Sequence, residues 1–146
     1  MSNNKYVELS KRQQHEMNAL PIAFAFSNKQ FEEMMVGWGL DPEKDLDKIA
    51  RIPAGGFVQK KDEQIITETV NRHDRELKEA IEADTDGSGF IYDMFLYELE
   101  NHEYGYTGDE SDTLMALGLS RKDIASDERL YHGLCMAMER IMGGQA

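Results

Sequence analysis

The chain has no lysine or arginine across the 42 residues between Lys78 and Arg121. The same window contains 11 aspartates and glutamates, so it carries a formal charge of −11. Residues 1–78 hold 12 basic and 13 acidic side chains, and residues 121–146 hold four of each. The net charge of −12 therefore comes almost entirely from one segment. Clustered like charge raises the free energy of the compact state, so this segment is a candidate surface for a partner of opposite charge.

Other absences exclude whole classes of protein. The single cysteine, Cys135, cannot form an internal disulfide, and no charged start followed by an apolar run resembles a signal peptide. We therefore expect a reducing, cytoplasmic location. The longest apolar stretch, residues 20–26, is interrupted by Pro21, whereas a membrane helix needs about 20 apolar residues. No membrane-spanning helix is therefore expected. A pI near 4.7 means that the protein and the phosphates of nucleic acid repel each other, so nucleic acid is not expected as a direct partner.

The composition is that of a folded protein. Hydrophobic residues make up 40% of the 146 positions and charged residues 30%, with three prolines. This length suits one domain, here residues 1–146, that can bury a substantial core. We expect a mainly α fold, a compact arrangement like a helical bundle, with at most a small two-stranded sheet.

Apolar spacing and capping residues predict where the elements lie. Ser27 and Gln30 have the spacing of a capping box, and His73 falls on the apolar stripe of a long helix, where we expect a satisfied core or edge residue. Alternating apolar residues predict strands at 22–26 and 57–60, which we expect to pair. Helices are predicted at residues 4–18, 27–36, 41–51, 62–81, 90–103, 109–117 and 127–142, with a short turn after Ser120.

The segment from Asp84 to Ile91 reproduces the first eight positions of an EF-hand calcium loop. Asp84, Asp86 and Ser88 would supply ligand oxygens there. The twelfth position, which needs a bidentate glutamate, holds Phe95, and no second loop of this kind occurs. We favour a glycine-rich connector between two helices, and a weak calcium site remains the alternative.

The acidic window also contains six of the 13 aromatic residues, including four of the six tyrosines. Tyrosine is enriched in interface cores, and the arginines of a basic partner can pair with carboxylates and stack on rings. The alternative is that acids face water while Phe90, Phe95 and Tyr97 face the core. The predicted partner-binding residues are Glu98, Glu100, Glu103, Tyr104, Tyr106, Asp109, Glu110 and Asp112.

No catalytic constellation is visible. The four histidines lie on separate predicted elements, and none has a second histidine or cysteine at ligand spacing. Cys135 has no neighbouring base that would activate it, so a structural thiol is the simplest interpretation. We therefore expect no enzymatic activity and, apart from the calcium alternative, no cofactor.

Three segments, residues 25–33, 89–108 and 112–120, resemble an uncharacterised family of small acidic proteins from phages and mobile elements of Gram-positive bacteria. The resemblance implies no catalytic residue. It does imply a context in which small acidic proteins inhibit host defence, as anti-CRISPR and antirestriction proteins do.

The expected function is therefore that of a phage-encoded inhibitor. It would bind a basic host protein, such as a defence nuclease, by placing carboxylates in the positions where the nuclease otherwise binds phosphates. A calcium-binding module is the alternative, and a homo-oligomer is left open.

Overall fold

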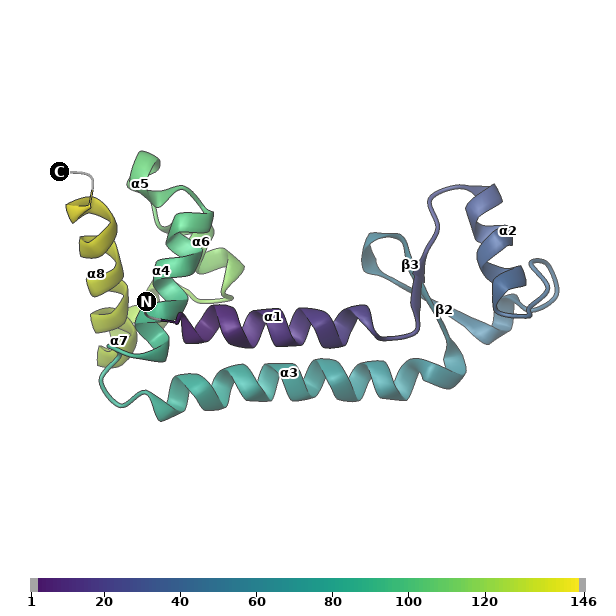
Figure 1. The fold of residues 1–146 in the computed structure, drawn as a ribbon, viewed down its shortest axis with the longest axis horizontal. Helices are drawn as coiled ribbons and strands as arrows, with labels where there is room; N and C mark the ends of the chain where they lie inside the picture. The colour runs from purple at the N-terminus through teal and green to yellow at the C-terminus, as the bar shows by residue number, and fades with distance from the viewer. Residues whose placement is uncertain (1–2, 145–146) are drawn as a thin grey trace. The chain divides into compact units, whose positions relative to one another are not determined.

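The computed structural model describes residues 3–144, which form eight α-helices, three short 3-10 helices and three β-strands (Figure 1). Contacts group the chain into two compact units. The sheet unit is Gln14–Asp74, and the helical unit contains the residues up to Gln13 and from Arg75 onward. The mainly helical fold with a small sheet is confirmed, and the single domain over residues 1–146 stays a prediction.

The sheet unit contains an antiparallel sheet of three strands in the order β1-β3-β2. They are β1 (Ile22–Phe24), β2 (Ile49–Ile52) and β3 (Gly56–Gln59). Val58 of the central strand is paired with Ile22 on one side and Ala50 on the other, and it is buried. The predicted pairing of residues 22–26 with 57–60 is confirmed.

The third strand, β2, corrects the predicted helix at 41–51. Asp41 does cap a turn, because its Oδ1 accepts hydrogen bonds from the main-chain nitrogens of Glu43 at 2.8 Å and Lys44 at 3.0 Å. The turn gives way to the 3-10 helix η1 (Leu46–Lys48), and the next four residues pair with β3. Branched Ile49 and Ile52 suit a strand that has a partner, and this pairing overrides the local capping signal. The helix prediction was wrong beyond the cap, and so was the limit of two strands.

Helix α2 (Asn28–Gly37) begins at the predicted cap, where Ser27 Oγ accepts a hydrogen bond from Gln30 N at 3.2 Å. The Gln30 side chain reaches one residue further back than a capping box requires and accepts from Phe26 N at 2.8 Å. Half of the predicted box is therefore confirmed. Near this cap, the rings of Phe31 and Phe57 pack edge-to-face, with their centroids 5.3 Å apart.

The two long helices are α1 (Lys5–Asn18) and α3 (Glu63–Ala83), each of which contributes residues to both units. Within the sheet unit, His73 Nε2 lies 2.7 Å from Glu16 Oε1, and Arg72 Nη2 lies 2.9 Å from the same oxygen. His73 is buried. It is a satisfied core residue, as predicted.

The helical unit is built around α4 (Phe90–Asn101) and α8 (Glu128–Gly143), with the short helices α5 (Tyr104–Thr107), α6 (Ser111–Ala116) and α7 (Arg121–Ser126) between them in sequence. Gly133 lets α8 approach α4 closely, because a Cβ there would meet Ile91 Cγ2 at 2.6 Å. The buried core consists of Ile91, Met94, Phe95, Leu99, Tyr104, Leu114, Ile124, Leu130, Leu134 and Ala137.

Capping residues begin two helices of this unit as the sequence predicts. Ser120 and Asp123 form a complete capping box at α7, and the Asp127 carboxylate accepts from the first main-chain nitrogens of α8. Among residues 3–144, no helix has the length and apolar character needed to cross a membrane.

Candidate interaction surface and the Asp84 loop

Most of the predicted contact residues lie on the exposed part of the helical unit between the end of α4 and α6. Glu100 and Glu103 are exposed at the end of α4, and Tyr106 on α5 is 91% exposed. Asp109 and Asp112 are exposed around the start of α6. Together with half-buried Glu110, these six residues are called the acidic surface below.

Glu98 and Tyr104 do not belong to this surface, because their side chains are only 9% and 8% exposed. Tyr104 is part of the hydrophobic core. The Glu98 side chain is within hydrogen-bonding reach of the phenol of Tyr6. Burial and the Glu98 charge raise the pKa of Tyr6 to about 12. Burial gives Glu98 and Tyr104 a structural role in this unit, and their role in partner binding stays a prediction.

Local hydrogen bonds fix the start of α6. Asp109 Oδ1 accepts from Ser111 N at 2.9 Å, and the hydrogen bonds from Ser111 lower the pKa of Asp109. Glu110 Oε1 lies 3.1 Å from Arg121 Nη2, which also donates to Ser111 Oγ at 3.2 Å. Arg121 is thus the cation that closes the acidic window in sequence and neutralises one of its carboxylates in space.

The remaining carboxylates are not neutralised in this way. Within residues 3–144, Glu100, Glu103 and Asp112 make no ion pair. Glu103 has a positive φ of 58°, and its carbonyl accepts from Tyr106 N at 3.0 Å. The turn between α4 and α5 therefore holds Glu103 and Tyr106 near each other. The arrangement offers carboxylates and one aromatic ring to a cationic partner.

The loop from Asp84 to Ser88 is held together by its own side chains. The Asp84 carboxylate accepts from the nitrogens of Gly87, Gly89 and Ile91 at 3.0, 3.0 and 2.9 Å. Asp86 Oδ1 accepts from Ser88 N at 2.9 Å and Ser88 Oγ at 2.6 Å. These bonds from Ser88 lower the pKa of Asp86.

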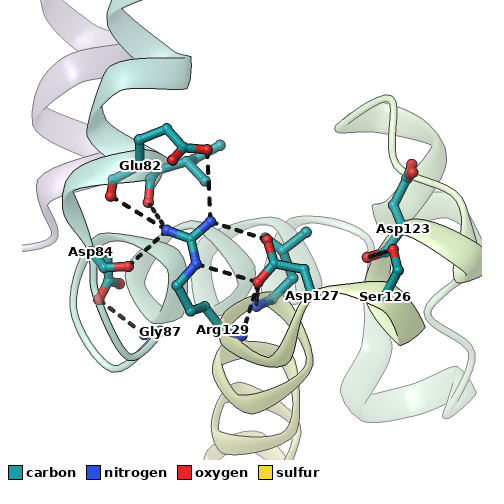
Figure 2. A network of polar contacts seen from close by, with 9 residues as sticks. Glu82, Asp84, Gly87, Asp123, Ser126, Asp127 and Arg129 are labelled. Carbon is teal, nitrogen blue, oxygen red and sulfur yellow. Dashed lines mark hydrogen bonds and ion pairs between the residues drawn. The ribbon is translucent and has the colours of Figure 1, made fainter.

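Arg129 of α8 occupies the side of this loop, as Figure 2 shows. Its Nη1 lies 3.0 Å from the carbonyl oxygen of Asp84, and its Nη2 lies 3.0 Å from Asp127 Oδ2. His132 Nδ1 lies 2.7 Å from the carbonyl oxygen of Asp86. Phe95, at the twelfth position, is fully buried. Occupied oxygens and an adjacent guanidinium favour the connector over a calcium site, and calcium binding stays a prediction.

Sequence reasoning missed the role of Arg129. Its contacts with Ile81, Glu82 and Asp84 join residues 45 to 48 positions apart. The sequence predicted only a helix over residues 127–142 here, and no local pattern indicates so distant a partner. Tyr6 was missed for the same reason, since its contacts with Phe90 and Tyr97 join residues 84 and 91 positions apart.

Comparison with known families identifies the chain's relatives. One family model, described as a family of unknown function, matches residues 5–140. The chain belongs to this family, DUF7659. The match to DUF7659 includes the Asp84 loop and the whole acidic surface. No curated protein and no solved structure matches the chain.

Proposed function

We propose that this protein is a non-enzymatic interaction protein whose acidic surface binds a basic, nucleic-acid-handling protein such as a nuclease. The observation that carries the proposal is the exposure of Glu100, Glu103 and Asp112 without an ion pair among residues 3–144. Carboxylates left free in this way repel one another, and a cationic partner removes that repulsion.

The physical mechanism is substitution for phosphates. Carboxylates along α4 to α6 would contact lysines and arginines that otherwise hold the nucleic-acid backbone. The negative field of the segment would also steer association, so that salt weakens binding mainly by slowing it. Tyr106, which is 91% exposed, supplies a ring on which an arginine can stack.

The biological setting completes the proposal. The resemblance to small acidic proteins of phages and mobile elements supports an inhibitor that acts in the cytoplasm of an infected or lysogenic cell. Its target would be a defence nuclease of the CRISPR or restriction type.

Competition with labelled double-stranded DNA tests this function. Purified CRISPR and restriction nucleases are held with the DNA at low and at moderate salt, the protein is added, and release of DNA is followed by fluorescence anisotropy. We expect release by the wild-type protein that weakens with salt. The triple variant Glu100→Gln/Glu103→Gln/Asp112→Asn should be weaker by about tenfold or more, since three exposed pairs at about 0.5 kcal/mol each are lost.

The matched control is Glu32→Gln/Glu33→Gln/Glu43→Gln, which removes the same charge from exposed positions of the sheet unit. This control should compete as well as the wild-type protein. Equal weakening by both triple variants would show an effect of net charge alone. If the wild-type protein releases DNA from none of the nucleases, the proposed target is contradicted.

A further inference from the structure

A groove in the helical unit lies beside the acidic surface and has no assigned role. It has a volume of about 360 Å³ and is lined by side chains of α6, α7 and α8 together with Glu110. Leu114, Ile124 and Leu134 are buried beneath it. Tyr131 and Ala125 line it from exposed positions. The groove is therefore an apolar surface open to solvent, at the small end of the range for pockets that bind ligands.

Negative charges predominate on the α6 and α8 sides of the groove, whereas α7 carries the exposed cations Arg121 and Lys122. Among its lining residues, Glu110 and Arg121 are charged, and they pair with each other at 3.1 Å. Asp109 and Asp112 flank Glu110 in sequence and are exposed. On the α8 side, Glu128 lies three residues before Tyr131, and Glu139 lies four residues after Cys135, so both share a helix face with lining residues. An apolar side chain entering here would have carboxylates on the α6 and α8 sides and the cations of α7 on the third side.

The length of the groove indicates what can fill it. Its α8 wall extends from Tyr131 to Met138, about 10 Å at 1.5 Å per residue. This is the distance between positions i and i+7 of a partner helix, which is the usual spacing of anchors in helix-in-groove recognition. Two or three apolar side chains from one helix face would cover the groove.

We propose that this groove binds the apolar face of a basic amphipathic helix, whose lysines or arginines contact the carboxylates on either side. This inference rests on the proposed function and names the partner's chemistry. The apolar anchors supply burial, and the flanking charges supply orientation and association rate.

Cys135 provides a direct probe, because it is the single cysteine of the chain and lines the groove in a half-buried position. The full-length protein is alkylated with iodoacetamide with and without a synthetic helical peptide of leucine and lysine. At ten times its Kd, the peptide should slow alkylation about tenfold, since only the free fraction reacts. Two further peptides serve as controls, one with serine in place of leucine and one with glutamate in place of lysine.

Variants separate filling of the groove from binding nearby. Ala125→Trp places a large ring in the groove and should abolish binding of the labelled leucine–lysine peptide. Ala116→Trp, at an exposed α6 position outside the groove, should leave it unchanged. Circular dichroism checks that both variants fold. If Ala125→Trp does not fold, Tyr131→Ala serves in its place. It removes an exposed side chain that lines the groove, so it should weaken binding of the peptide.

Several results would overturn the inference. Equal protection by the serine–lysine peptide would mean that charge alone binds, and equal protection by the leucine–glutamate peptide would mean that the carboxylates play no part. Protection that rises with protein concentration alone would assign the groove to a second copy of the chain. Protection of Cys135 by the leucine–lysine peptide without release of DNA from any nuclease would support the groove and refute the nuclease target. Release of DNA without protection of Cys135 would support the nuclease target and refute the groove.

Discussion

Nη1 of Arg129 lies 3.0 Å from the carbonyl oxygen of Asp84, 45 residues earlier in the chain. The same nitrogen lies 3.1 Å from the carbonyl oxygen of Ile81. On the other side of the guanidinium, Asp127 accepts from Nε at 3.3 Å and from Nη2 at 3.0 Å. One side chain therefore joins the end of α3, the loop after it and the start of α8. Carbonyls at a helix C-terminus carry partial negative charge and lack partners within the helix, which suits a cation at this place.

Replacing Arg129 should destabilise the helical unit. Arg129→Ala removes several hydrogen bonds from a charged donor, and we expect a loss of about 2–3 kcal/mol in the free energy of unfolding by urea. Arg129→Lys keeps the charge but lacks the planar fork, so it should restore only part of this. Arg140→Ala, at an exposed position of the same helix, is the control and should stay within about 0.5 kcal/mol of the wild type. Equal losses at positions 129 and 140 would contradict the role of Arg129.

Elements with local signals were predictable from the sequence. The start of α2 follows from Ser27, and the start of α7 follows from Ser120 with Asp123, because a hydroxyl or carboxylate at a cap acts on main-chain groups two or three residues away. Strand β2 was not predictable in this way. Its residues become a strand only because β3, several residues later, offers a partner on its free edge.

The contact surface divides for a related reason. Glu98 and Glu100 look alike in sequence, yet Glu98 lies on the inner side of α4, and Glu100 lies on the outer side. A glutamate on the inner side is unfavourable unless it has a partner, and Tyr6 on α1 is near enough to supply a phenol. Because that partner is 92 positions away in sequence, no local pattern could show that Glu98 is structural.

Gly87 should tolerate substitution less well than other glycines with positive φ. Its φ is 85°, and an added Cβ would collide with the main-chain oxygen of Arg129. Gly118 has a φ of 69° but open space around it. Gly118→Ala should therefore cost only the backbone term of about 1–2 kcal/mol, and Gly87→Ala should cost about 1–3 kcal/mol more, because α8 must move. Thermal and urea unfolding of the two variants give the comparison, and similar losses would contradict the close approach.

The Asp84 carboxylate should stabilise the fold without calcium. It accepts three main-chain hydrogen bonds, so Asp84→Ala should lower the free energy of unfolding by about 1–3 kcal/mol in the presence of a chelator. Added calcium should neither raise the stability of the wild-type protein nor give heat in isothermal titration below millimolar concentration. Micromolar binding that Asp84→Ala abolishes would instead support the calcium alternative.

Tyr6 should make stability depend on pH in the alkaline range. Its phenol is half-buried between Phe90 and Tyr97, and burial together with the Glu98 charge raises its pKa to about 12. In the unfolded chain a tyrosine ionises near pH 10. Because the folded-state pKa is the higher one, the contribution of Tyr6 is complete below about pH 10 and is lost as the pH rises toward 12.

Tyr6→Phe has no proton to lose, so its free energy of unfolding should fall less steeply over this interval. Urea unfolding followed by circular dichroism at several pH values from 9 to 11.5 measures both slopes. The hydrogen bond to Cys135 also raises the pKa of Tyr131, so absorbance at 295 nm should show more than one late-ionising tyrosine, and the part due to Tyr6 should disappear in Tyr6→Phe. Identical slopes for the two proteins would show that the phenol of Tyr6 is no more buried than in the unfolded chain.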